Sequence, residues 1–139
     1  MNILVFDTAS STCSAAILVN GVVVAENQKL ITQQHAEILV PMIEQILFDV
    51  EMDYGDISLI GVTTGPGSFT GIRIGIATAR ALALACNTPL IGVTNFEVLA
   101  HAVARADRIG RRILVILETK RDDFYVCVYS DHLDLIHHP

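Results

Sequence analysis

The sequence predicts an α/β fold in which helices flank a mixed sheet with three adjacent N-terminal strands. Three observations predict it: apolar strand patterns open the chain, helix and strand patterns then alternate, and a glycine-rich loop joins one strand to a helix. The chain has 139 residues, of which 52% are apolar and 17% charged. That length suffices for one core and is short for two ordinary domains.

The three N-terminal strands are predicted from apolar runs. Residues 3–6 form a continuous apolar run that ends at Asp7, as expected of a strand buried on both faces. Residues 13–19 and 22–25 flank Asn20-Gly21, a strong signal for a two-residue hairpin turn. We therefore expect three neighbouring strands.

The remaining elements alternate. Apolar residues recur at helical spacing over residues 33–50, where Pro41 predicts either a kink or a later start. A capping-box pattern at Thr94 and Glu97 begins another helix. The other expected elements are strands at 57–64, 89–93, 113–117 and 124–129, and a helix at 71–86.

Composition limits the classes of function. Arg73, Arg80 or Glu44 interrupts each long apolar stretch before about 18 residues, so we expect no transmembrane helix and no membrane partner. The chain opens without the basic start of a signal peptide. The three cysteines are odd in number and far apart, which predicts reduced thiols and a cytoplasmic location.

Charge is unevenly distributed. The net charge of −6 disfavours electrostatic binding of nucleic acid by the chain alone. Five acids crowd residues 44–56, whereas six of the nine Lys and Arg residues lie within residues 105–121. Both clusters are either solvated surface or, for the basic one, an edge that helps a partner hold RNA.

The glycine-rich loop is the most informative segment. A strand ends, the loop 65–71 follows, and a helix begins with free N–H groups directed at the loop, an arrangement that suits an anion. The loop lacks the Gly-Lys-Ser/Thr of a Walker loop and the spacing of the dinucleotide fingerprint. The alternative is a rigid turn that positions helices. The candidate anion- or nucleotide-binding residues are Asp7, Gly65, Gly67, Ser68, Thr70 and Gly71.

Asp7 follows the first strand directly and precedes a hydroxyl-rich turn. It either organises a phosphate or a metal ion through water, or hydrogen-bonds that turn. No Ser/His/Asp, Cys/His or metal-ligand spacing stands out elsewhere, so we predict neither catalytic nor metal-binding residues.

The helix predicted at 71–86 is apolar on nearly every side, and one sheet covers only one side. The remaining surface is either modestly exposed or covered by a protein partner. Stripes of small residues let another helix approach closely. The candidate interface residues are Leu39, Met42, Ile43, Ile46, Gly75, Ala79, Leu82 and Ala83.

Residues 3–8 are echoed by residues 113–119: each segment is an apolar strand that ends in an acid and a hydroxyl. The echo is either a coincidence between buried strands or the sign of a duplicated lobe. On the second interpretation, residues 1–108 form a first lobe and residues 109–139 begin a second, truncated one.

These residues resemble the TsaB (YeaZ) family across essentially the whole chain. The resemblance rests on Phe6-Asp7-Thr8, on His35-Ala36-Glu37, on Leu39-Val40-Pro41-Met42 and above all on residues 65–75. It implies the fold of an actin-like (RNase H-like) ATPase lobe, similar to actin and Hsp70-type proteins. Family members continue through a fuller second lobe than the one that ends here at Pro139.

The resemblance implies a role in adding the threonylcarbamoyl group to adenosine 37 of ANN-decoding tRNAs. Proteins of this family support a catalytic paralogue, TsaD, which binds metal through an HxxxH motif. Asn95 and Leu99 stand where its histidines would be, so that chemistry is not inherited.

From this resemblance we expect a non-catalytic subunit that binds a TsaD-like transferase, with a TsaE-like ATPase as a further candidate partner. We expect a homodimer in isolation and tRNA only through the complex. No cofactor is expected to bind tightly, although a weak nucleotide site shared with partners is consistent with the fold. The alternatives are a nucleotide-hydrolysing phosphotransferase-type lobe and a metallopeptidase-like protein.

Overall fold

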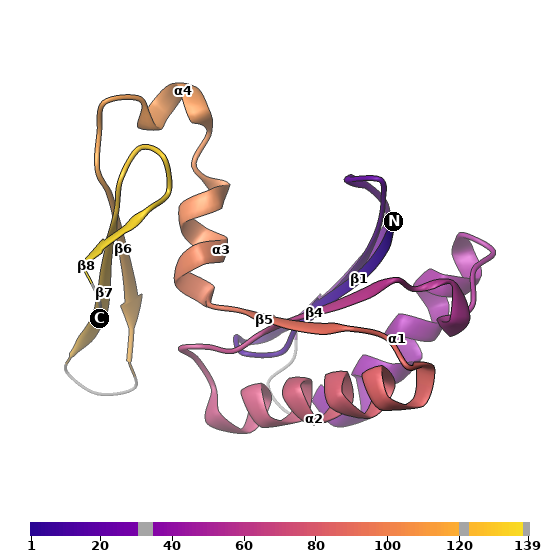
Figure 1. The fold of residues 1–139 in the computed structure, drawn as a ribbon. Helices are drawn as coiled ribbons and strands as arrows, with labels where there is room; N and C mark the ends of the chain where they lie inside the picture. The colour runs from indigo at the N-terminus through magenta and orange to yellow at the C-terminus, as the bar shows by residue number, and fades with distance from the viewer. Residues whose placement is uncertain (31–34, 120–122, 138–139) are drawn as a thin grey trace. The chain divides into compact units, whose positions relative to one another are not determined.

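The structure is a computed structural model that describes residues 1–30, 35–119 and 123–137 (Figure 1). Its contacts divide the chain into two compact units, Met1–Val93 and Thr94–Pro139. This division falls earlier than the lobe boundary expected after residue 108. The reason is that helix α3 (Asn95–Ala102) packs on strand β6 (Ile113–Glu118) and so belongs with the second unit.

The first unit is built on a five-stranded sheet in the order β3-β2-β1-β4-β5. β1, β2 and β3 form an antiparallel meander, and β4 and β5 extend the sheet parallel to β1. The strands are β1 (Asn2–Asp7), β2 (Thr12–Val19), β3 (Val22–Leu30), β4 (Leu59–Thr63) and β5 (Leu90–Val93). Asn20 and Gly21 both have positive φ, as a tight turn between β2 and β3 requires. The predicted mixed sheet with three adjacent N-terminal strands is therefore confirmed.

Two helices cover one face of this sheet (Figure 1). α1 (His35–Asp49) packs on β2 and β3, while α2 (Phe69–Cys86) packs on β4, β1 and β5. A short 3-10 helix, η1 (Tyr54–Asp56), precedes β4. Pro41 lies inside α1, so the expectation of a late helix start at that residue is wrong; the expected start at residue 33 lies outside the described residues.

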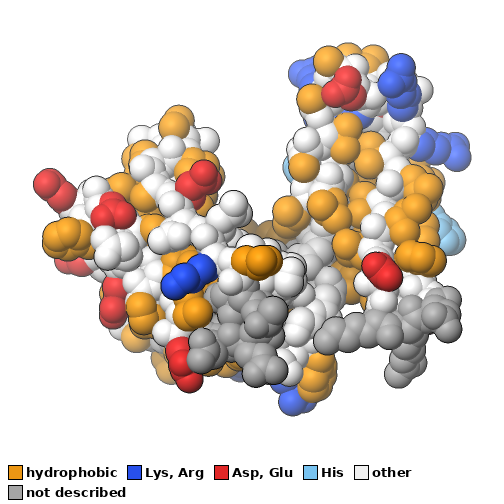
Figure 2. All heavy atoms as spheres, turned by 180° about the vertical axis from the view of Figure 1, so that it is seen from behind, with side chains coloured by type: hydrophobic (Ala, Val, Ile, Leu, Met, Phe, Trp, Pro, Cys, Tyr) orange, Lys and Arg blue, Asp and Glu red, His pale blue; other side chains and the backbone are white. Residues whose placement is uncertain are grey.

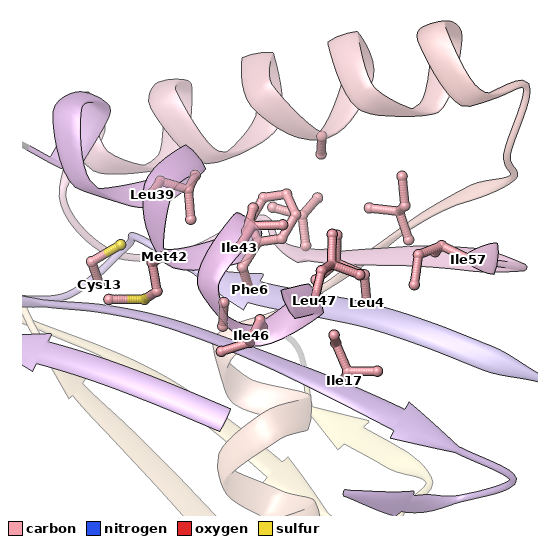
Figure 3. Close-up of a cluster of buried hydrophobic side chains, with 14 residues drawn as sticks. Leu4, Phe6, Cys13, Ile17, Leu39, Met42, Ile43, Ile46, Leu47 and Ile57 are labelled. Atoms are coloured by element: carbon pink, nitrogen blue, oxygen red, sulfur yellow. The ribbon is translucent and has the colours of Figure 1, made fainter. Parts of the chain in front are cut away.

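The core of the first unit lies between the sheet and these helices. Alternate strand positions such as Leu4, Phe6 and Ile17 point at α1, where Ile43 and Leu47 meet them (Figure 3). This alternation is the period of two of a strand that buries one face under helices. The expectation that the first strand is buried on both faces is therefore wrong, because Ile3 and Val5 are only partly buried. In this cluster the apolar residues of α1 pack against the sheet, and the opposite side of the helix faces away from the sheet.

By length and hydropathy alone, α2 is apolar enough to cross a membrane, and composition does not separate such a span from a core helix. The interruption by Arg73 and Arg80 therefore does not exclude a span by itself. Packing on the sheet accounts for part of this composition, because Gly71, Gly75 and Ala79 are buried where α2 meets the sheet. Only 17% of the helix is buried within the structure, so the rest of its apolar character is not explained by that packing.

The second unit is a three-stranded antiparallel sheet, β6-β7-β8, with α3 against β6. Phe96 and Ala100 of α3 bury Val115 and Cys127 of the sheet. The other elements are β7 (Phe124–Tyr129), β8 (Leu135–His137) and the four-residue helix α4 (Arg105–Arg108). The sequence echo between residues 3–8 and 113–119 falls on the first strand of an antiparallel meander in each unit.

Candidate functional site

The glycine-rich loop joins β4 to α2 and packs against the turn between β1 and β2. Ser68 N donates to the Ala9 carbonyl at 2.6 Å, and Thr8 Oγ1 donates to the Gly71 carbonyl at 2.7 Å. A Cβ at Gly67 or Gly71 would overlap the carbonyl group of Ala9 or Thr8. These two glycines therefore allow the backbones of the two turns to touch, which no other residue type permits.

The carboxylate of Asp7 forms hydrogen bonds in the same region, where the turn after β1 meets the glycine-rich loop. Oδ1 accepts hydrogen bonds from Ala9 N, at 3.0 Å, and from Thr63 Oγ1, while Oδ2 accepts from Ser10 Oγ at 3.4 Å. One carboxylate thus joins the end of β1, the following turn and the end of β4. Of the two interpretations of Asp7, hydrogen bonding of the hydroxyl-rich turn is the one these contacts support.

The six residues predicted to bind an anion lie on this loop and on the adjoining end of β1. Ser68 caps α2 by accepting from Gly71 N at 3.3 Å, and Gly65 adopts a φ of +100°. Thr70 is exposed in the first turn of the helix. Because Ser68 N and Gly71 N are both engaged within the protein, the contacts account for a rigid turn. The anion site stays a prediction.

Six of the eight predicted interface residues are buried on the sheet side of α1 and α2, so their selection is wrong, whereas Leu82 and Ala83 are only partly buried and stay a prediction. Those on α1 are core residues, at most 5% exposed: Leu39, Met42, Ile43 and Ile46. Those on α2 are buried, or partly buried against the same core: Gly75, Ala79, Leu82 and Ala83. The helical recurrence used to select them marks the side that faces the sheet, because a helix buries its apolar stripe.

The outward side of the same helices carries exposed apolar residues instead. Phe69 and Leu84 of α2 are 68% and 85% exposed, and Phe48 of α1 is 79% exposed. Ala77 and Ala81 lie exposed between the two α2 residues. We call Phe48, Phe69, Ala77, Ala81 and Leu84 the outer helix face. Along the outward side of α2 these apolar residues alternate with the exposed Arg73 and Arg80. Large apolar side chains left exposed together mark interaction surfaces in soluble proteins.

Sequence reasoning missed these residues, although a signal for them was present. Once Gly71, Gly75 and Ala79 are assigned to the sheet, helical spacing places Ala77, Ala81 and Leu84 away from it. The choice between the two stripes needed the position of the sheet, which the sequence alone does not give.

The outward side of the two helices also carries exposed charges, acidic on α1 and basic on α2. Glu37 and Glu44 are exposed on α1, and Arg73 and Arg80 are exposed on α2. The Arg73 guanidinium lies 4.0 Å from the centre of the Phe69 ring, so this cation also covers part of the apolar surface. A second copy crossing α1 over α2 would meet charge of the opposite sign.

α3 begins at the capping box that the sequence predicts. Glu97 N donates to Thr94 Oγ1 at 3.2 Å, and Thr94 N donates to the Glu97 carboxylate at 2.7 Å. The hydrogen bond from the Thr94 backbone is the main cause that holds the pKa of Glu97 below its ordinary value. Glu97 is thus engaged in capping the helix, and Leu99, one turn after Asn95, offers no ligand atom.

The described part of the chain contains no group of three or more His, Cys, Asp and Glu residues arranged to hold a metal ion. Burial raises the pKa of the Cys13 thiol and of the Cys127 thiol above the ordinary value. Thiols of this kind stay protonated near neutral pH and make poor nucleophiles.

The chain is similar in sequence to a known protein family and to several characterised proteins. The family model for "TsaD: tRNA N6-adenosine threonylcarbamoyltransferase" matches residues 21–136. The tRNA threonylcarbamoyladenosine biosynthesis protein TsaB of Escherichia coli K12 is 35% identical over 130 residues, covering 94% of this chain and 55% of that protein. A tRNA N6-adenosine threonylcarbamoyltransferase of Clostridium kluyveri is 32% identical over 113 residues, covering 70% of this chain and 33% of that enzyme.

A solved structure, YeaZ from Pseudomonas aeruginosa, superposes with a TM-score of 0.85 at 27% identity. The superposition covers 98% of this chain and 64% of YeaZ. The chain thus spans about half the length of the curated TsaB protein it matches. Together, the family model, the curated relatives and the solved YeaZ structure show that the chain belongs to the TsaB (YeaZ) family.

Proposed function

We propose that the chain is a non-catalytic partner subunit required for threonylcarbamoylation of adenosine 37 in ANN-decoding tRNAs, where it binds and supports a TsaD-type transferase. The observation that carries the proposal is the outer helix face. Phe48, Phe69 and Leu84 are each more than two thirds exposed on a protein of a family named for this modification. Burial of that surface by a partner is the role best matched to it.

Residue chemistry supports the non-catalytic part of the proposal. The transferase family uses an HxxxH metal motif, whereas this chain has Asn95 and Leu99 in the corresponding places. Leucine offers no atom to a metal ion, and Glu97 between them is hydrogen-bonded to Thr94. The helix that would carry the chemistry is capped and packed as an ordinary structural element.

The same surface supports a finer proposal about assembly. A partner that resembles this chain would present an acidic α1 and a basic α2, so that either a second copy or a TsaD-type lobe meets complementary charge. The homodimer forms in isolation, and the transferase replaces one copy in the working complex. A TsaE-like ATPase joins this complex in the cytoplasm, and tRNA reaches the chain only there.

The hydrogen bonds of the glycine-rich loop support a further part of the proposal: the chain alone binds no nucleotide or other cofactor tightly. Ala9 and Ser68 occupy two of the N–H donors that would otherwise contact a phosphate. Any nucleotide binds weakly at a site completed by a partner. Calorimetric titration of ATP into the chain, without and with the transferase, checks this; micromolar binding by the chain alone would contradict it.

The proposal is tested by reconstitution with a TsaD-type transferase, unmodified tRNA and an activated donor of the threonylcarbamoyl group. Mass spectrometry of digested tRNA should show the threonylcarbamoylated nucleoside when the transferase and the chain are combined, and only background when either is omitted. Modification by the chain without the transferase would make it the catalyst. An unchanged rate when the chain is added would remove its supporting role.

A further inference from the structure

Arginines gather at one end of the second unit, around α4 and the start of β6. Arg105, Arg108, Arg111 and Arg112 fall within eight positions, with Asp107 as the only acid among them. This stretch therefore carries +3 (four arginines less one aspartate) in a chain whose net charge is −6. Figure 2 shows blue side chains concentrated at this end of the unit, beside a single red group.

Hydrogen bonds hold the backbone of this stretch in place. Arg108 Nη1 donates to the Asp131 carbonyl at 2.6 Å, and Gly110 N donates to the Asp131 carboxylate at 3.0 Å. These bonds fasten the segment between α4 and β6 to the turn between β7 and β8. Arg108 is accordingly half-buried and serves the fold, whereas Arg105, Arg111 and Arg112 are exposed.

The three exposed guanidinium groups lack a carboxylate partner among the described residues. The ion pair that the described residues form within 4.0 Å joins His132 to Asp131, and Arg111 Nη1 reaches only the backbone carbonyl of Asp107, at 3.4 Å. In an acidic protein, arginines commonly find carboxylates to pair with. Here three arginine side chains remain available on a segment whose backbone is held by hydrogen bonds. Each guanidinium group can donate two parallel hydrogen bonds to phosphate oxygens.

We propose that Arg105, Arg111 and Arg112 form a contact site for the phosphate backbone of RNA. This site increases the affinity of the transferase complex for its tRNA. The inference rests on the proposed function, since it takes the bound RNA to be the tRNA of the complex. Three phosphate contacts release few counterions, so at physiological salt the site adds to an existing complex and does not hold tRNA unaided on a chain of net charge −6.

The test uses the complex of the chain with a TsaD-type transferase and unmodified tRNA. Arg105→Gln, Arg111→Gln and Arg112→Gln are combined in one variant, and Arg108 is kept because it fastens the fold. The tRNA affinity should fall about tenfold at 50 mM salt, and the slope of log K against log salt should become shallower by about two to three.

Two control variants separate a local contact from a change in overall charge. Asn27→Asp, Gln28→Glu and Lys29→Gln on the exposed β3 also lower the net charge by three and should leave tRNA affinity within about twofold. The triple Arg→Lys variant keeps the charges and should retain most of the binding and of the salt slope.

Equal loss of affinity in both charge-lowering variants, or none in the arginine variant, would overturn the site. If the arginine variant instead fails to bind the transferase, the patch recognises protein and the inference is wrong. A wild-type chain that does not bind the transferase at all contradicts the proposed function. In that case, titrating tRNA into the chain alone at 20 mM salt still tests the patch, which is rejected if the arginine variant binds as the wild type does.

Discussion

The inner and outer sides of the α1–α2 pair both carry apolar residues, yet they differ in what covers those residues. On the inner side Ile43 is fully buried and Gly75 packs against Thr8, so the chain supplies the neighbour. On the outer side Phe48 and Leu84 are 79% and 85% exposed. Inner substitutions should therefore change the free energy of unfolding, and outer substitutions should change association.

The largest effect on stability is expected from Ile43→Ala. Ile43 is 0% exposed between α1 and the sheet, and its removal leaves a cavity that costs about 2–5 kcal/mol of unfolding free energy. Urea unfolding followed by circular dichroism measures the loss. Phe48→Ala, five positions along the same helix, should change stability by no more than about 0.5 kcal/mol. Similar losses for both variants would erase the distinction between the two sides.

A smaller effect is expected from Gly75→Ala. The added Cβ would lie 2.5 Å from Thr8 Oγ1 and 3.4 Å from Val62 Cγ2. Overpacking of this kind costs about 1–3 kcal/mol, whereas exchanging glycine for alanine in a helix returns about 1 kcal/mol. Thr8 Oγ1 also donates to the Gly71 carbonyl, and displacing it loses that hydrogen bond as well. The net loss should be about 1–2 kcal/mol.

The matched control for that comparison is Ala77→Leu, which adds a larger side chain to the outer side of the same helix. Leucine is a good helix former, so thermal unfolding of this variant should be nearly unchanged. A stabilised Gly75→Ala protein would mean that helix propensity outweighs the contact with Thr8, and that Gly75 is not needed for close packing.

The smallest effect is expected in the second unit, from Glu97→Ala. Loss of the capping box should cost about 1 kcal/mol and speed hydrogen exchange of α3 amides. Because the folded-state pKa of Glu97 is lowered, its stabilising contribution is present above the unfolded pKa of about 4.3 and is lost as the pH falls through the folded pKa. The difference between variant and wild type should therefore be full at pH 7 and shrink toward pH 3. A difference that is independent of pH would show that the carboxylate charge plays no part.

Most of the fold could be predicted from local signals. The Asn20-Gly21 turn, the Thr94–Glu97 capping box and the continuous strands each follow from chemistry within a few residues. The effect of Pro41 on α1 could not, because the cost of a proline inside a helix competes with burial of the surrounding apolar stripe. Pro41 is exposed within α1, so burial of the stripe prevails.

The candidate site was less accessible to sequence reasoning. The glycine-rich loop has the residues of an anion site, but two of its N–H groups are engaged within the protein. Gly71 N donates to Ser68 in the same loop. Ser68 N donates to the carbonyl of Ala9, which is distant in sequence and is brought to the loop only by the tertiary structure. Likewise, the stripe through Gly75 and the stripe through Ala77 are both composed of small residues. Only the position of the sheet decides which of them remains available to a partner.

The most direct measurement of the central claim is the affinity of the chain for a TsaD-type transferase, and for itself, when charge enters the outer helix face. Ala81→Glu and Leu84→Glu should each weaken association at least tenfold, because an unpaired buried charge costs several kcal/mol. Ala102→Glu, an exposed alanine at the end of α3, is the matched control and should bind as the wild type does. Sedimentation velocity gives the affinities, and circular dichroism should show all three variants folded. Normal association of folded Ala81→Glu and Leu84→Glu proteins would contradict the claim that this face is the docking surface.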